Sequence, residues 1–273
     1  MKLNVLGIGD IVGRPGRVIV RERLRDFRVK EQIHFVVANG ENLAGGSGLL
    51  PGEAKELLEA GVDVITAGDH VWAKKDIIPY ISATQRLLRP ANYPAVQPGA
   101  GYTIIDTHAC KVGVIHVVGR VFMTLAQADC PFTTAERLAD EIRKQTPVVI
   151  LDMHAEATAE KIAIGWHLDG KVSYIFGTHT HIQTADERIL PKGTAYITDV
   201  GMTGPYESVI GRRIDRVLHK FITQMPAPFD VAENDVRMCG AVATIDTATG
   251  RAEGIRRIVM RQDGSLRDPG AAL

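Results

Sequence analysis

This chain of 273 residues has few cysteines, no net charge and no long apolar run. Its three cysteines, Cys110, Cys130 and Cys239, are odd in number and have no metal-type spacing, so we expect free, packed thiols in a reducing compartment and no disulfide framework. Lysine plus arginine and aspartate plus glutamate both number 32, and this balance argues against a protein that tracks long DNA or RNA. A small anionic substrate remains compatible with it.

No apolar run is long enough to span a bilayer. Runs such as Val148–Leu151 end after a few residues, whereas a membrane-spanning helix needs about 20. The N-terminus enters a strand pattern at Leu3 without an apolar signal-peptide region, so we expect a cytoplasmic protein. A hydrophobic content of 45% over this length allows one large core, and we expect residues 1–273 to form a single domain.

Short apolar runs bounded by glycine or polar residues recur along the chain and predict buried strands. They are Leu3–Ile8, His34–Ala38, Val62–Thr66, Val112–Val118, Val148–Leu151, Val172–Phe176 and Ala195–Thr198. Helical patterns separate several of them, and Thr133–Glu136 reads as a capping box at the start of one helix. Residues 242–246 and 255–260 flank a turn and predict an antiparallel hairpin. This order predicts an α/β protein with a mixed, largely parallel sheet.

The stretch GIGDIVGRPG, residues 7–16, connects the first predicted strand to the first helix. A glycine-rich turn at this place is typical of dinucleotide binding. Here Gly7, Gly9 and Gly13 give the spacing G-x-G-x-x-x-G, and Asp10 would stand where the pyrophosphate approaches. We therefore favour Asp10 as a cation ligand over an NAD site.

Five predicted strand ends carry carboxylate, amide or imidazole side chains. They are Asp10 after the first strand, Asn39, Glu41 and Asn42 after the second, Asp69 and His70 after the third, Asp152 and His154 after the fifth, and His179 and His181 after the sixth. Because loops at the carboxyl ends of strands in an open α/β sheet converge on one crevice, these side chains predict one site. Their mixture of oxygen and nitrogen atoms suits a pair of divalent ions such as Mn, Fe, Zn or Mg.

Two features of this set indicate a site for two metal ions. His179 and His181 are two residues apart, so in an extended backbone both side chains would point to one side and reach neighbouring ions. Glu41 could bridge those ions through its two oxygens. Such a centre is typical of a two-metal hydrolase, in which ions about 3.5–4 Å apart hold a hydroxide and clamp the phosphoryl oxygens.

Five longer motifs connect the chain to a known family. GDIVGRPGR, NGENLAGG, DMHAEATAEK, GTHTHIQTAD and TDVGMTGP occur in this order. They closely resemble the YmdB-type bacterial metallophosphoesterases, relatives of the calcineurin-like phosphoesterases that act as phosphodiesterases on 2′,3′-cyclic nucleotides. The resemblance runs from Asp10 to about Ile210 and continues weakly to the end. It implies a four-layer α/β/β/α sandwich, whose sheets the hairpin predicts to be mixed.

The resemblance also implies a role for each site residue. Asp10, Asn42 and His181 would bind one metal ion, Asp69, His154 and His179 the other, with Glu41 between them and His70 as the proton donor to the leaving group. The expected cofactors are two divalent metal ions, Fe, Mn, Zn or Mg. The expected partner is a small phosphodiester or cyclic nucleotide, with neither long nucleic acid nor a membrane involved, and a homo-oligomer stays open.

Asp69 departs from the family, which carries Asn at this position. A third carboxylate predicts tighter metal binding and a weaker Lewis acid, because its charge raises the pKa of a bound water. We expect hydrolysis of a phosphodiester by a hydroxide that bridges the metal ions. Two alternatives stay open: a phosphomonoesterase or RNA-end hydrolase, and a non-catalytic regulatory protein that binds metal and nucleotide.

Two further acids lie close to the predicted ligands. Asp152 precedes His154 by two residues, and Asp199 follows the last predicted strand. Metal-bound imidazoles usually need a hydrogen-bond partner that orients them, and either acid could serve. A simple turn role is equally open for both.

Overall fold

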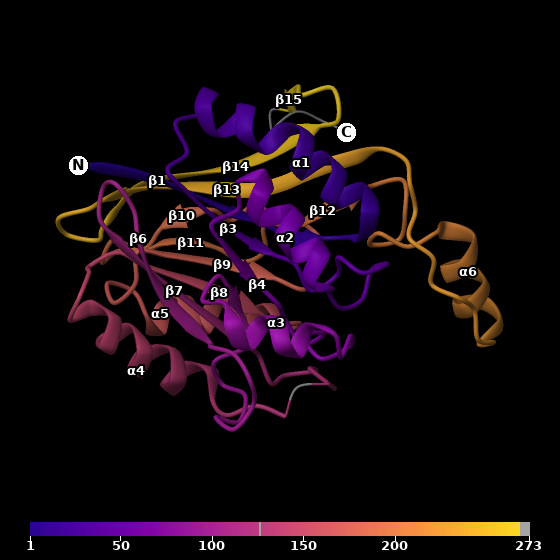
Figure 1. Cartoon of the computed structure of the whole chain (residues 1–273), viewed down its shortest axis with the longest axis horizontal. Helices are drawn as coiled ribbons and strands as arrows, with labels where there is room; N and C mark the ends of the chain where they lie inside the picture. Colours follow the sequence, from indigo (N-terminus) through magenta and orange to yellow (C-terminus); the bar gives the residue numbers. More distant parts are fainter. Residues whose placement is uncertain (126, 268–273) are drawn as a thin grey trace.

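Two β-sheets packed face to face form the centre of the protein in the computed structural model, which describes residues 1–125 and 127–267 (Figure 1). Helices cover the outer face of each sheet. The resulting four layers confirm the α/β/β/α sandwich with mixed sheets that the resemblance and the hairpin predict.

The first sheet has the strand order β15-β14-β13-β1-β3-β4-β5, with β2 and β12 pairing beside it. Its strands are β1 (Lys2–Ile8), β2 (Asp10–Ile11), β3 (Phe35–Asn39), β4 (Val64–Thr66), β5 (Leu87–Leu88), β12 (Met202–Pro205), β13 (Val236–Asp246), β14 (Ala252–Arg261) and β15 (Leu266–Arg267). Strands β1, β3, β4 and β5 are parallel. Strands β13 and β14 form the predicted antiparallel hairpin, and β13 pairs antiparallel with β1.

The second sheet has the order β10-β11-β9-β8-β7-β6. Its strands are β6 (Tyr102–Asp106), β7 (Lys111–Val118), β8 (Val149–His154), β9 (Tyr174–Thr178), β10 (Arg188–Ile189) and β11 (Ala195–Ile197). The four central strands are parallel, and the two edge strands run antiparallel to their neighbours. Both sheets are therefore mixed.

Six helices lie within the described residues. They are α1 (Gly13–Lys30), α2 (Pro51–Ala60), α3 (Ile77–Ala83), α4 (Pro131–Arg143), α5 (Thr158–His167) and α6 (Ile214–Thr223). The first three pack on the first sheet, while α4 and α5 pack on the second. Helix α6 projects from the body (Figure 1).

The start of α4 differs from the prediction. The helix begins at Pro131 after Cys130 and has no side-chain cap, so the capping box at Thr133–Glu136 is wrong. Proline is well suited to the first helical turn, because its fixed φ is helical and its missing N–H would be unpaired there anyway. Glu136 instead contacts Lys171 and His167, which lie outside α4.

The side chains of β1 alternate between two layers of the hydrophobic core. Leu3 and Val5 pack between the sheets, while Leu6 and Ile8 pack under the helices. Successive side chains of a strand point to opposite faces, so a strand buried on both faces is apolar throughout. This arrangement fixes the distance and alignment of the two sheets.

The cysteines are free thiols, as predicted. Only Cys239 is fully buried, whereas Cys110 and Cys130 are half-buried, so the expectation of packed thiols is wrong for those two. Within residues 1–125 and 127–267, no helix combines the length and apolar character needed to cross a bilayer.

Candidate metal centre

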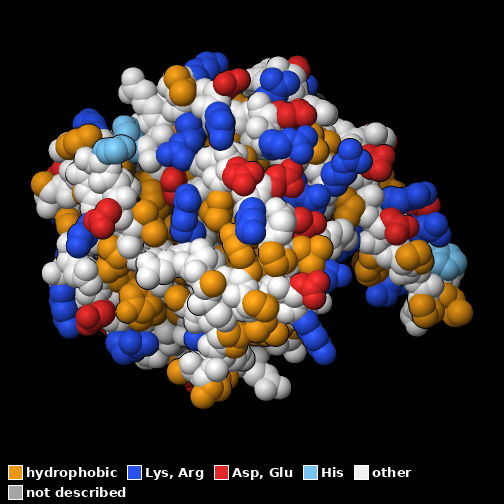
Figure 2. All heavy atoms as spheres, in the orientation of Figure 1, with side chains coloured by type: hydrophobic (Ala, Val, Ile, Leu, Met, Phe, Trp, Pro, Cys, Tyr) orange, Lys and Arg blue, Asp and Glu red, His pale blue; other side chains and the backbone are white. Residues whose placement is uncertain are grey.

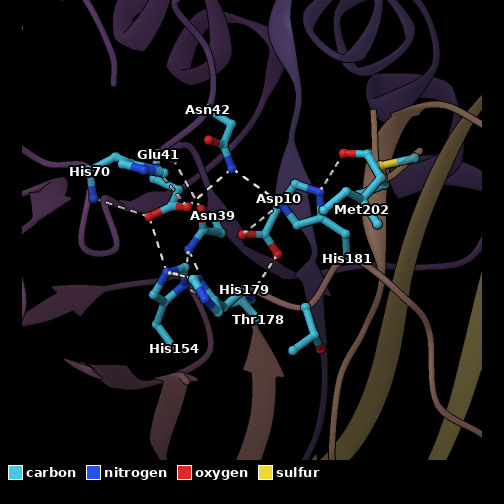
Figure 3. Close-up of polar contacts among 12 residues, drawn as sticks. Asp10, Asn39, Glu41, Asn42, His70, His154, Thr178, His179, His181 and Met202 are labelled. Atoms are coloured by element: carbon cyan, nitrogen blue, oxygen red, sulfur yellow. Dashed lines mark hydrogen bonds and ion pairs between the residues drawn. The ribbon is translucent and has the colours of Figure 1, made fainter. Parts of the chain in front are cut away.

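Strand ends from both sheets meet at one edge of the sandwich (Figure 3). Asp10 lies in β2, Glu41 and Asn42 follow β3, Asp69 and His70 follow β4, His154 ends β8, and His179 and His181 follow β9. Direct contacts connect all eight residues that the sequence predicts.

One half of the site is a compact group of nitrogen and oxygen atoms. Ligand atoms of Glu41, Asp69, His154 and His179 all lie within 4.8 Å of one another. His154 Nε2 is 3.1 Å from Glu41 Oε2, 3.3 Å from Asp69 Oδ1 and 3.1 Å from His179 Nδ1. Two carboxylates and two imidazole nitrogens converge here, and such a set of electron-pair donors fits a cation.

The pKa values of these side chains also fit a bound cation. Burial alone would lower the pKa of His154, but the carboxylates of Glu41 and Asp69 raise it well above its usual value. Burial would raise the pKa of Glu41, yet its charge interaction and hydrogen bond with His154 hold it well below the usual range. Burial and the neighbouring His154 lower the pKa of His179 to about 4. The carboxylates therefore favour positive charge beside His154, which a divalent ion would supply, while the lowered pKa of His179 favours the neutral imidazole that a metal ligand requires.

The other half of the site contains Asp10, Asn42 and His181. Asp10 is fully buried, and its Oδ1 has no hydrogen-bond partner within the described part of the chain. This oxygen lies 3.8 Å from His181 Nε2, and burial raises the pKa of Asp10 to about 6. A buried carboxylate oxygen without a partner is costly, so the donor set fits a cation on this side as well.

Asn42 presents its amide nitrogen to this half of the site. The nitrogen lies 3.3 Å from His181 Nε2 and 3.1 Å from Glu41 Oε1. A metal ligand must be the amide oxygen, and a half-turn of the amide exchanges the two atoms. Asn42 lies beside Glu41 and His181, and its amide is oriented as a hydrogen-bond donor to Glu41.

Hydrogen bonds orient two of the imidazoles. His181 Nδ1 lies 3.0 Å from the carbonyl oxygen of Ile210, which can only accept, so Nδ1 carries the proton and Nε2 faces Asp10. Thr178 Oγ1 donates to Asp152 Oδ1 at 2.7 Å and therefore accepts from His154 Nδ1 at 2.9 Å. His154 Nε2 is thus left as the ligand atom, because the partner of the other ring nitrogen sets the tautomer.

Asp152 connects His154 to the loop that carries Asp69. Its second oxygen accepts a hydrogen bond from Thr66 Oγ1 at 2.6 Å and lies 3.3 Å from His116 Nδ1, while the backbone N–H of Gly68 donates to His116 Nε2. The orienting role left open for Asp152 is the one its contacts support. His116 is fully buried and connects Asp152 to the backbone of Gly68.

Gly68 has a geometric reason to be glycine. A Cβ atom at this position would lie 1.8 Å from Glu41 Oε2 and 2.9 Å from His154 Cε1, and φ is +48°. Any side chain would push the loop away from Glu41. The close approach of the β4 loop to the site therefore needs a residue without Cβ.

The backbone at the two histidines is not extended, so that expectation is wrong. φ is +94° at His179 and +66° at His181. Thr180, between them, donates to Asp199 Oδ2 from its hydroxyl at 2.6 Å and from its N–H at 3.3 Å. Lys161 Nζ contacts the same oxygen at 2.7 Å. This buried group holds the bent loop, and the bend directs His179 toward His154 and His181 toward Asp10.

His70 and Glu156 lie at the open side of the centre. His70 Nδ1 is 3.2 Å from Glu41 Oε1, its side chain is 30% exposed, and the hydrogen bond with Glu41 raises its pKa. Glu156 Oε2 is 3.2 Å from His179 Nε2. Glu156 was missed in the sequence, although it follows His154 by two residues in the motif DMHAEATAEK.

Known proteins resemble this chain in sequence and in structure. A 2′,3′-cyclic-nucleotide 2′-phosphodiesterase of Bacillus subtilis is 46% identical over 261 residues, which cover 96% of this chain and 98% of the relative. A solved structure described as a novel phosphatase of Mycoplasma pneumoniae is similar with a TM-score of 0.89 and 32% identity, covering 98% of this chain and 95% of the other. A Thermus thermophilus structure described as a hypothetical protein gives 0.88 and 38%, covering 95% and 99%.

The family comparison covers most of the chain. The family model described as YmdB-like protein matches residues 6–258, from β1 to β14. The chain therefore belongs to the YmdB-like family of metallophosphoesterases, as its sequence motifs predict.

Proposed function

We propose that this chain is a metal-dependent phosphodiesterase that hydrolyses 2′,3′-cyclic nucleotides. The observation that carries the proposal is the buried convergence of Asp10, Glu41, Asp69 and the three histidines, with an unpartnered carboxylate oxygen on one side. The name of the Bacillus subtilis relative supports the choice of substrate.

Seven side chains would hold two divalent ions. Asp10, Asn42 and His181 form one set, Asp69, His154 and His179 the other, and Glu41 lies between the two sets. Ions bound there would polarise the phosphoryl oxygens and activate a water nucleophile. The protein keeps these ligands in place through Thr178, Asp152 and the carbonyl of Ile210, which orient two of the imidazoles before any substrate arrives.

His70 protonates the leaving oxygen in this proposal. Its Nδ1 is anchored on Glu41, and its ring lines the same cleft as His179 and His181. A positioned imidazole typically contributes about 10²–10⁴-fold to a rate by proton transfer. His70 acts without occupying a metal ligand position, so its contribution can be separated from metal binding.

The cleft above the ligands has a volume of about 430 Å³. Small-molecule sites typically occupy roughly 300–1,000 Å³, so this cleft fits a mononucleotide. Glu41, Asn42, His70, His179 and His181 line its inner end. A phosphate at that end would lie beside the ligand sets and beside the proposed proton donor.

The proposal is tested by measuring metal content and hydrolysis on one purified sample. We expect two equivalents of metal per chain after loading with Mn²⁺, and turnover of 2′,3′-cyclic AMP and of bis-para-nitrophenyl phosphate. His154→Ala should lose metal and activity together. His167→Ala, which removes a surface imidazole from α5, is the matched control and should keep both.

Three outcomes would contradict the proposal. Turnover of para-nitrophenyl phosphate without turnover of either diester would indicate a phosphomonoesterase. Saturable nucleotide binding by the metal-loaded protein without turnover would indicate a regulatory protein. Activity that survives in His154→Ala would place the reaction in a contaminating enzyme.

A further inference from the structure

The outer wall of the cleft is formed by α6 and the segment that follows it. Val217, Lys220 and Phe221 are spaced i, i+3 and i+4, so they share one face of the helix, and all three line the cleft together with Phe229. Phe221 is 71% exposed although its ring lies at the opening of the site. Figure 2 shows the hydrophobic side chains gathered on this projecting arm.

Arg212 fixes this wall to the catalytic loops. Its guanidinium donates to the carbonyl oxygens of Gly45 at 3.0 Å and Phe229 at 2.6 Å, and also to that of Gly46. Gly45 and Gly46 follow Asn42 in the loop that carries Glu41. The aromatic wall and the ligand loop are therefore held together by one side chain, and the cleft between them is a built feature.

The rings are available to a planar ligand. Lys220 places its ammonium 4.5 Å from the centroid of the Phe229 ring, which fixes that ring beside the cleft. Phe221 extends from the same helical face, one residue further. Exposed aromatic side chains beside a catalytic centre mark a binding surface, because leaving them in water has a free-energy cost.

We propose that Phe221 and Phe229 form the nucleobase site of this enzyme, with Lys220 at its edge. This inference rests on the proposed function and extends it from the phosphate to the rest of the substrate. The cleft is continuous from His179 and His181 to Phe221 and Phe229, so one nucleotide can place its cyclic phosphate at the ligands and its base on the rings.

The chemistry of the wall determines its specificity. Val209, Ile210, Val217, Phe221 and Phe229 offer aliphatic and aromatic surface to the cleft. Stacking on aromatic rings accepts every base, because each base has a π face. The enzyme should therefore accept cyclic nucleotides with all four bases and bind base-free cyclic phosphates more weakly.

The test compares a substrate with a base to one without. KM is measured for 2′,3′-cyclic AMP and for ribose 2′,3′-cyclic phosphate, using the Mn²⁺-loaded full chain. Phe221→Ala and Phe229→Leu should each raise KM for cyclic AMP about tenfold, equivalent to about 1.4 kcal/mol, and leave KM for the base-free compound unchanged. Phe221→Trp should keep the affinity for cyclic AMP.

Ile222→Ala is the matched control. Ile222 neighbours Phe221, is 78% exposed and does not line the cleft, so its replacement should change neither KM. An equal rise in KM for both substrates would overturn the proposal, because the loss of affinity would not depend on the base. A change in the molecular mass of either variant by light scattering would show that a second copy of the chain covers this face, and this result would overturn the proposal too. Unchanged KM values in both phenylalanine variants would overturn it as well.

The base site can be tested even if the chain has no phosphodiesterase activity. If the unaltered chain turns over neither compound, calorimetry with adenosine 3′-monophosphate and ribose 5-phosphate on the same variants still tests the base site. Tighter binding of the adenosine compound that Phe221→Ala removes would support the aromatic site. Equal binding of the two compounds would refute it.

Discussion

Replacing Lys161 by methionine should destabilise the protein and loosen its metal centre. Lys161 in α5 and Asp199 are 1% and 0% exposed, and their charged atoms are 2.7 Å apart. Lys161 Nζ also lies 3.3 Å from Thr180 Oγ1. Methionine nearly fills the volume of the lysine stem, so Lys161→Met removes the charge and leaves the packing close to intact.

The expected loss of stability comes from the Asp199 carboxylate, which Lys161→Met leaves buried without its cation. Removing one partner of a buried ion pair typically costs about 3–5 kcal/mol, because the other charge stays buried without compensation. Asp199 still accepts hydrogen bonds from Thr180 and from the N–H of Gly201, which places the expected loss near the lower end, about 3 kcal/mol. Lys161→Met together with Asp199→Asn should cost less than the sum of the two single losses.

Lys161→Met should also weaken metal binding, through the loop that carries His179 and His181. A left-handed backbone costs roughly 1–2 kcal/mol at a residue with a side chain, and both His179 and His181 have positive φ. The hydrogen bonds from Thr180 to Asp199 help to hold this loop. When Asp199 loses its cation, we expect the loop to relax and the affinity for Mn²⁺ to fall about tenfold.

Urea unfolding followed by circular dichroism measures the loss of stability. It is carried out in chelator, so that metal binding adds nothing to the free energy of unfolding. Calorimetric titration with Mn²⁺ measures the loss of metal affinity. Lys171→Met is the matched control, because it removes a lysine from the half-exposed pair with Glu136 and should cost less than about 1 kcal/mol. Equal unfolding midpoints and equal Mn²⁺ affinities for Lys161→Met and Lys171→Met would refute the reasoning.

Three further predictions follow from the site and the thiols. Asp69→Asn should weaken Mn²⁺ binding by between about 1 and 4 kcal/mol and move the pH–rate profile to lower pH, since one negative charge is lost near the ligands; unchanged affinity and profile would contradict this. His70→Gln should lower kcat for 2′,3′-cyclic AMP by about 10² or more without loss of metal, but should scarcely affect bis-para-nitrophenyl phosphate, whose leaving group needs no proton; an equal loss on both substrates would argue against proton donation. Iodoacetamide at pH 8 should label Cys130 first, because hydrogen bonds from the start of α4 lower its pKa, and should spare Cys239, whose pKa burial raises to about 12; mass spectrometry that finds equal labelling would refute this.

Local apolar patterns were enough to predict the central strands. Leu3–Ile8 and Val112–Val118 match β1 and β7 within a residue, since a strand buried on both faces has an uninterrupted apolar run. The prediction for β8 stopped at Leu151, whereas the strand continues to His154. Asp152 is polar yet fully buried, because Thr66, Thr178 and His116 surround its carboxylate. Those partners are distant in the sequence, so the local pattern could not show them.

Helix α6 was missed although its pattern was present. Ile214, Val217, Leu218, Phe221 and Ile222 have the spacing of one apolar helical stripe. Since only Val217 of α6 is buried, packing contributes little to this helix. Of the five stripe residues, Val217 and Phe221 line the cleft.

The apolar core between the two sheets brings the ligand residues together. Strand-end reasoning predicts a crevice at the edge of one parallel sheet, but Asp10, Glu41 and Asp69 belong to one sheet, and His154 and His179 to the other. Their strands end at the same edge because apolar side chains such as Val37 and Phe176 pack between the sheets. Hydrogen bonds then join the strand ends directly, from Asn39 to Thr178 and from Thr66 to Asp152. A sequence shows which residues end strands, but only the packing of the two sheets determines which strand ends meet.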